Sequence, residues 1–194
     1  MGPMHNVPFA PLFVRDPRLA PYVTSVQPVW LWSAKDARVI WSNASGAAVF
    51  GAATVKDLIT RVIDPDDMAA AEIARLAESL HYGGAPRLER LRGFGAGVFR
   101  LPVCVCSRIT FKDQMPAVLV VGTEAVGPEL PLVERIRRLF DGTDQAIAVF
   151  SPDGSLAYAT LGGHEQIGGV RKLGILVRRP WRKRRCALVG RPER

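Results

Sequence analysis

Few side chains in this 194-residue sequence could do chemistry. Cys104 and Cys106 stand two positions apart on an expected strand, so their thiols would share one face of a sheet. A thiol pair can bind a metal or take part in redox chemistry, but a metal site needs further ligands, and His5 and His81 stand in unrelated contexts. We therefore interpret the two thiols as structural and expect no metal site.

Four aromatic residues are the candidates for binding a small molecule. Trp30, Trp32, Trp41 and Phe50 could line a pocket, or they could simply form an apolar core. The two interpretations stay open at this level, because both require large apolar side chains on elements that pack together.

The elements around these aromatics have the clearest local pattern in the sequence. Two runs of aromatic and β-branched residues, 29–32 and 39–41, flank a polar link, which predicts a β-hairpin. Asn43 follows at the position of a helix N-cap, where its side-chain oxygen can accept a free backbone N–H. A small-residue helix should then end at Gly51.

Further elements complete one domain. Residues 53–63 and 66–80 are expected to be helices, and 82–86 a loop. Three strands are expected over 87–94, 98–111 and 116–123. The order β-β-α-α-α-β-β-β predicts an α+β fold, with an antiparallel sheet that carries its helices on one face.

The opening pattern then returns. After an amphipathic helix at 131–140, residues 146–160 repeat residues 28–43 at an offset of 117 to 118 positions. Phe150 matches Trp32, Tyr158 matches Trp41, and Thr160 takes the cap position of Asn43. A repeat at this spacing predicts tandem domains. The second copy would be incomplete, leaving an unpaired sheet edge and exposed Ile147, Val149 and Phe150, so we expect poor solubility unless the chain dimerises.

The hairpin ending in Trp41-Ser-Asn43 and the small-residue helix closing at Phe50-Gly51 resemble a PAS domain over residues 25–126, and the resemblance restarts at 144. Longer phrases resemble the N-terminal sensory region of alphaproteobacterial histidine kinases of the cell-division control type. These phrases are Trp30-Leu-Trp32, Phe50-Gly-Ala-Ala-Thr54, Gly83 through Phe94, and Cys104-Val-Cys-Ser-Arg108. The resemblance implies a sensor histidine kinase in which PAS domains precede a dimerisation helix pair and an ATP-binding domain.

The catalytic half of such a kinase is not recognisable in this chain. His164-Glu165 has the dipeptide of a phospho-accepting helix, but Gly162 and Gly163 should disfavour a helix there. No nucleotide-binding loop of the GxxxxGK[ST] type occurs. We therefore expect this chain to have no enzyme activity and no catalytic residue. Relative to the kinases it resembles, the chain would be truncated.

No cofactor is expected either. A haem-binding PAS domain needs an axial ligand, and His81, between a helix and a loop, is better interpreted as exposed. A light-sensing flavin domain needs a reactive cysteine, and residues 53–80 contain none.

The net charge of +8 is concentrated at one end. Residues 1–176 contain 18 Lys and Arg against 17 Asp and Glu, whereas residues 177–194 contain 8 against 1. A basic tail could bind nucleic acid, and this is the alternative function, but a near-neutral domain counts against it. A reading-frame shift near residue 175 would also explain the tail.

These features predict five regions: a Pro-rich irregular arm (1–24), a PAS-like sensory domain (25–126), a connector helix (127–143), an incomplete second PAS-like domain (144–176) and a basic, disordered tail (177–194). The three cysteines and the lack of a signal peptide or long apolar run favour the cytoplasm, without a membrane span. The expected partners are a second copy, joined through the PAS domain and connector helix, and a downstream kinase region or response regulator.

Overall fold

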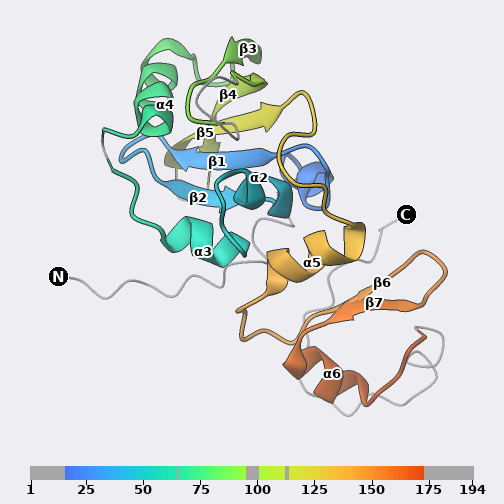
Figure 1. The fold of residues 1–194 in the computed structure, drawn as a ribbon. Helices are drawn as coiled ribbons and strands as arrows, with labels where there is room; N and C mark the ends of the chain where they lie inside the picture. Colours follow the sequence, from blue (N-terminus) through green and yellow to red (C-terminus); the bar gives the residue numbers. More distant parts are fainter. Residues whose placement is uncertain (1–15, 65, 95–100, 112–113, 173–194) are drawn as a thin grey trace. The chain divides into compact units, whose positions relative to one another are not determined.

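A computed structural model describes residues 16–64, 66–94, 101–111 and 114–172. The chain divides into two compact units, Met1–Asp144 and Gln145–Arg194. Figure 1 labels their helices and strands. Most of the expected arm and the whole basic tail lie outside the described residues. The arm residues that are described include one short 3-10 helix, η1 (Ala20–Tyr22).

The first unit is built on a five-stranded antiparallel sheet with strand order β2-β1-β5-β4-β3. Its elements follow the expected order, and their bounds are β1 (Val29–Ser33), β2 (Val39–Ser42), α2 (Ala44–Val49), α3 (Val55–Thr60), α4 (Met68–Ser79), β3 (Arg87–Arg90), β4 (Val103–Phe111) and β5 (Met115–Gly122). The predicted α+β class with an antiparallel sheet is confirmed. The helices expected over 53–63 and 66–80 and the strands expected over 87–94 and 98–111 were too long, whereas the two hairpin strands were each one residue too short. Helix ends and strand ends depend on caps and partners as well as on pattern.

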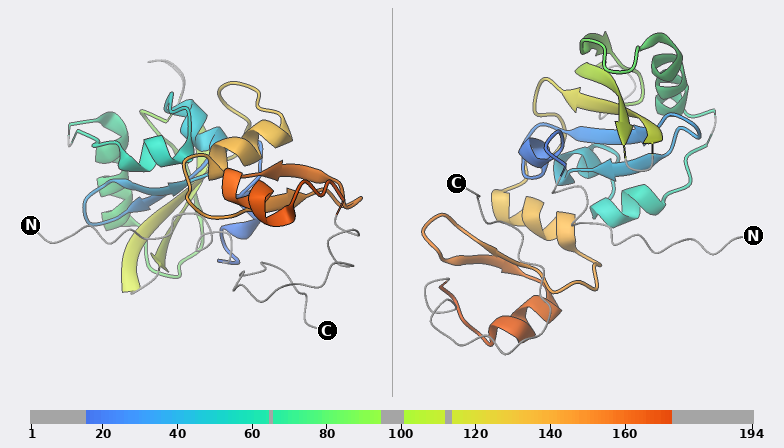
Figure 2. Two further views of the ribbon diagram at one scale, coloured as in Figure 1. Left: turned by 90° about the horizontal axis from the view of Figure 1, so that it is seen from below. Right: turned by 180° about the vertical axis from the view of Figure 1, so that it is seen from behind.

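Strand β1 lies inside the sheet, between β2 and β5, and all five of its residues are buried. Trp30 and Trp32 stand opposite Val120 and Val118 of β5, while Leu31 stands opposite both Leu119 and Trp41. Side chains alternate along a strand, so the two tryptophans occupy one face of the sheet and Leu31 the other. Helices α2 and α4 pack on the tryptophan face, and Figure 2 shows α4 alongside the strands in both views.

The predicted cap of α2 is present. The Asn43 side-chain oxygen accepts the N–H groups of Gly46 (2.8 Å) and Val29 (3.1 Å). Its amide nitrogen donates to the carbonyls of Gln27 (2.8 Å) and Tyr22 (3.0 Å). A single buried side chain thus joins the start of the helix, the start of β1 and the segment before it, and satisfies backbone groups that would otherwise be buried without partners.

The connector helix belongs to the first unit. Helix α5 (Leu132–Phe140) has Ile136 and Leu139 buried, and Leu139 is part of the main core. Leu132 and Val133, at 50% and 55% exposure, stay on the surface. The part of the amphipathic helix that contains Ile136 and Leu139 therefore packs on its own unit, where α5 contacts α2 and α3.

The second unit repeats the opening of the first. Its hairpin consists of β6 (Ala148–Phe150) and β7 (Leu156–Ala159), followed by α6 (Leu161–Ile167). Both hairpins carry an irregularity at the same place, between Leu31 and Trp32 in β1 and between Val149 and Phe150 in β6. Each of the three residue pairs in the first hairpin has an equivalent pair in the second, at the repeat offset of 117 to 118 positions.

The cap also recurs. The Thr160 hydroxyl oxygen accepts the N–H groups of Gly163 (3.2 Å) and Ile147 (2.9 Å) and donates to the Gln145 carbonyl (2.8 Å). These partners are the repeat equivalents of Gly46, Val29 and Gln27. The Asn43 amide nitrogen also donates to the carbonyls of Tyr22 and Ser25, since an amide has two protons to donate where a hydroxyl has one.

The expectation that Gly162 and Gly163 prevent a helix was wrong, because both lie within α6. Position 163 has no room for a side chain, which explains why a glycine stands there. A Cβ on Gly163 would stand 2.2 Å from the Ile147 carbonyl oxygen, and a Cβ on Gly46 would stand 2.7 Å from the equivalent Val29 oxygen. Glycine lets each helix start close to its hairpin, and this close approach outweighs the low helix propensity.

Candidate functional site

A cluster of four aromatic rings lies between the sheet and α2. Strand β1 contributes Trp30 and Trp32, the end of α2 contributes Phe50, and the turn after β3 contributes Phe94. Phe94 lies 5.1 Å from Trp30 and 5.6 Å from Trp32, measured between ring centroids. Phe50 lies 5.7 Å from Trp30 and from Phe94, with edge-to-face geometry in both pairs.

The cluster has the geometry of a packed core. Trp30, Trp32 and Phe94 are fully buried, and centroid separations between 5.1 and 5.9 Å are those of favourable aromatic pairs. The four rings pack against one another in the space between α2 and the sheet. Of the two interpretations left open by the sequence, the core accounts for the contacts of the three predicted residues Trp30, Trp32 and Phe50.

The fourth predicted residue lies elsewhere. Trp41 pairs directly with Leu31, so it occupies the face of the sheet opposite Trp30 and Trp32. The irregularity between Leu31 and Trp32 causes this, because an extra residue in the hairpin changes which side chains share a face. Phe94 was not among the predicted residues. Its sequence signal is an aromatic side chain between two glycines at the end of the expected strand 87–94.

The two indole N–H groups of the cluster have different environments. Trp30 Nε1 donates to the Gly46 carbonyl at 3.0 Å and so links β1 to α2. Trp32 Nε1 is buried and has no hydrogen-bond partner among the described residues. A buried donor without a partner loses its hydration without compensation, so Trp32 Nε1 is the one group in this cluster that a polar atom could still satisfy.

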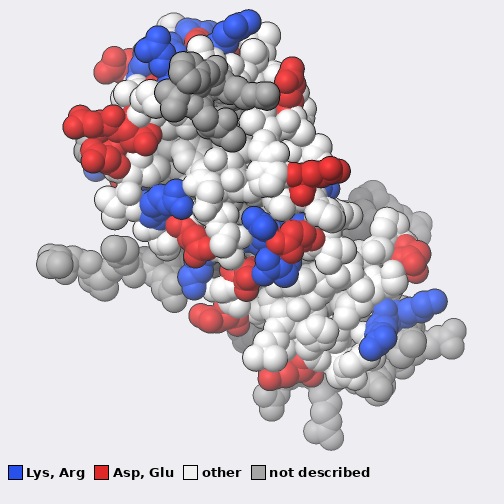
Figure 3. All heavy atoms as spheres, in the orientation of Figure 1, with Lys and Arg blue, Asp and Glu red and all other residues white. Residues whose placement is uncertain are grey.

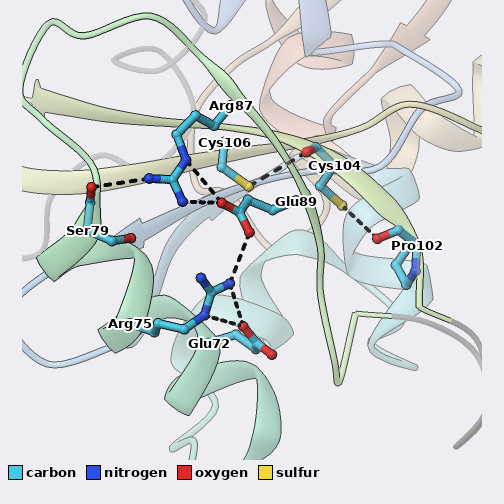
Figure 4. A network of polar contacts seen from close by, with 8 residues as sticks. All are labelled: Glu72, Arg75, Ser79, Arg87, Glu89, Pro102, Cys104 and Cys106. Atoms are coloured by element: carbon cyan, nitrogen blue, oxygen red, sulfur yellow. Dashed lines mark hydrogen bonds and ion pairs between the residues drawn. The ribbon is translucent and has the colours of Figure 1, made fainter.

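Cys104 and Cys106 lie on β4, on the tryptophan face of the sheet, as their pairing with Gly122 and Val120 requires. Both are fully buried, and burial raises the pKa of each thiol to about 12. The Cys104 thiol donates to the Pro102 carbonyl and the Cys106 thiol to the Cys104 carbonyl, both at 3.9 Å (Figure 4). Because the thiolate is the reactive form, these cysteines are inert near neutral pH. This agrees with the structural role expected from the sequence.

A chain of charged side chains runs beside the cysteines, from α4 to the edge strand β3 (Figure 4). Arg75 contacts Glu72 at 2.8 Å and Glu89 at 3.3 Å, and Arg87 contacts Glu89 as well. The hydrogen bonds from Arg87 and then Arg75 lower the pKa of the Glu89 carboxyl. These ion pairs join α4 to β3 at the surface.

The histidines are not brought together. His81 and His164 are both exposed, one after α4 and the other on α6, and His5 lies outside the described residues. No group of three or more His, Cys, Asp and Glu side chains that could hold a metal ion occurs in the part of the chain that the structure describes. Within that same part, no helix is long and apolar enough to cross a membrane.

Charged side chains of both signs are interspersed on the face shown in Figure 3. The concentrated positive charge of the sequence lies in residues 177–194, outside the described residues. Nucleic-acid binding by this tail therefore stays a prediction from the sequence. No protein-family model matches the chain, and a comparison with curated proteins finds no match.

Proposed function

We propose that this chain is the sensory and dimerisation module of a cytoplasmic two-component histidine kinase, without the kinase catalytic core. The first unit would be a complete PAS-like domain, and the second unit the start of another. The observation that carries the proposal is the repeated capped hairpin, with the same irregularity, the same cap contacts and the same close glycine in both units.

The five-stranded antiparallel sheet and the order β-β-α-α-α-β-β-β support the PAS-like assignment. Two such domains in tandem would suit a role in sensing. Fold alone does not determine function, and the kinase assignment rests on the sequence phrases that resemble that family.

A contact path from the interior to the end of the first unit could transmit a signal. Trp30 connects β1 to α2 through the hydrogen bond to Gly46, and α2 contacts α5. Any event that changes the packing of the aromatic cluster, including a polar atom that binds Trp32 Nε1, would therefore act on α5. The exposed Leu132 and Val133 of α5 would supply a dimer contact in the whole kinase.

The gene itself tests the proposal. The DNA downstream of the codon for Arg194 should be read in all three frames. We expect one frame to encode the rest of a second PAS-like domain, a dimerisation helix with its phospho-accepting histidine, and an ATP-binding domain. If no frame encodes these, the kinase assignment is wrong, and the basic tail becomes the feature that must explain the function.

A further inference from the structure

The outer edge of β6 differs in strand pairing from the corresponding edge of β1. In the first unit, β1 is paired on both edges, with β2 on one side and β5 on the other. In the second unit, β6 pairs with β7 alone in the described part of the chain. Among the described residues, the edge that β5 occupies on β1 therefore has no partner strand on β6.

The repeat identifies the backbone groups on this edge. In β1, Leu31 directs its backbone groups toward β2, as Val29 does when its carbonyl accepts from Asn43. Trp30 and Trp32 then direct theirs toward β5. Their equivalents in β6 are Ala148 and Phe150, and neither makes a hydrogen bond through this edge to a described residue. An edge with unpaired N–H and C=O groups is a template for another strand.

We infer that β6 pairs with β6 of a second copy of this chain, antiparallel and around a twofold axis at Val149. In this register Ala148 stands opposite Phe150 of the second copy, and Phe150 opposite its Ala148. Both pairs have their backbone groups facing each other, as in the pairs that Trp30 and Trp32 form with β5. Val149 then faces Val149 across the axis, as Leu31 faces Leu119.

Two properties of the segment favour a second copy as the occupant. Residues 146–151 (AIAVFS) carry no charge, so a twofold pairing brings no like charges together. The twofold axis also pairs each backbone N–H and C=O group on this edge with a group of the identical strand in the second copy. Such self-complementarity is the condition for an isologous interface. Pro152 has no N–H and ends the ladder, which limits it to the short strand. This inference needs only the second unit and is independent of the proposed kinase role.

Charge substitutions at the twofold provide the test, with the full chain as the sample. The wild-type chain should show concentration-dependent dimers in size-exclusion chromatography with light scattering. Val149→Glu and Val149→Lys should each raise the dimer Kd about tenfold or more, since like charges face each other across the axis. An equimolar mixture of the two variants should restore dimers, because opposite charges then meet.

Two controls make the result specific. Leu161, 79% exposed at the start of α6, is away from the β6 edge, so Leu161→Glu should leave the dimer intact. Leu132→Glu changes the α5 surface offered above as the dimer contact of the kinase and should also leave this dimer intact. If Leu132→Glu abolishes dimers while Val149→Glu does not, the β6 inference is wrong and the α5 contact is supported.

A cross-link gives a second readout that does not depend on affinity. With Cys186 replaced by Ser, Val149→Cys should form an intermolecular disulfide under mild oxidation, because residues directly opposite in a non-hydrogen-bonded pair lie close enough for one. Leu161→Cys in the same background should not. Equal or faster cross-linking at Leu161 would overturn the inference, as would a monomeric wild-type chain at every concentration.

Discussion

The two capped hairpins share their local geometry and differ in what surrounds them. Every residue of β1 is buried, whereas every residue of β6 is half-buried. Both have the same pairing, irregularity and cap, so these features come from short-range sequence. Burial comes from β5 and from large side chains, since Trp30 and Trp32 are replaced by Ala148 and Phe150 in the second unit. A hairpin can therefore be specified locally, but its core is supplied by distant strands.

The largest expected effect on stability comes from replacing Trp30 with alanine, the residue at the equivalent position of the second unit. Trp30→Ala places in β1 the side chain found at Ala148, and it should lower the free energy of unfolding by about 4 kcal/mol, because it leaves a cavity beside Phe50 and Phe94. Urea denaturation followed by circular dichroism measures this. Trp30→Phe, which keeps a ring but loses the hydrogen bond to Gly46, should cost clearly less. Equal losses would mean that the ring does not support the cluster.

The close approach of helix and hairpin should be nearly as sensitive. Gly46→Ala should cost about 3 kcal/mol, because its Cβ would stand 2.4 Å from the Ser42 hydroxyl oxygen as well as close to Val29. Gly163→Ala should disrupt the second unit in the same way.

Gly162→Ala is the matched control for this pair of substitutions. Its Cβ would meet nothing nearer than 3.5 Å, so it should be neutral or stabilise α6 by about 1 kcal/mol. Limited proteolysis of the second unit compares the two variants. A Gly162→Ala chain that is cleaved as fast as Gly163→Ala would contradict the steric explanation.

A smaller effect should follow from exchanging the caps. Asn43→Thr gives α2 the cap of α6, keeps an acceptor for Gly46, and loses the donor to the Tyr22 carbonyl. We expect a loss of about 1 kcal/mol in the same denaturation experiment. Thr160→Asn should not destabilise α6. If Asn43→Thr behaves like Asn43→Ala, the two caps are not equivalent.

The last effect concerns pH. Burial raises the pKa of Cys104 and Cys106 to about 12, so the folded chain holds thiol protons that the unfolded chain releases above about pH 8.5. Their contribution is full below that pH and is lost as pH rises through the folded pKa. The urea midpoint should therefore fall from about pH 8 to pH 10 more in the wild type than in the Cys104→Ala, Cys106→Ala variant. Parallel curves would mean that the thiols are not buried.

Short-range patterns predicted most of the fold. The hairpin, the Asn43 cap, the order of elements and the repeat with its Thr160 cap follow from residue types at fixed spacing. Three features needed the structure. Trp41 lies on the other face because of an irregularity that the sequence does not mark, Phe94 enters the cluster from a turn, and α6 forms despite two glycines because Gly163 touches Ile147. The last two depend on contacts between separate elements, whereas the first depends on the exact register of the hairpin, which residue pattern alone does not determine.

Residue-resolved amide hydrogen exchange of the dilute, monomeric chain tests most directly whether the second unit is an open copy of the first. The amides of Trp30 and Trp32, which face β5, should exchange slowly, and those of Ala148 and Phe150 rapidly. Leu31 and Val149, which face their own hairpin partners, should be protected in both units. If Ala148 and Phe150 exchange as slowly as Trp30 and Trp32 under these conditions, another part of the chain covers the β6 edge, and the second unit is not open.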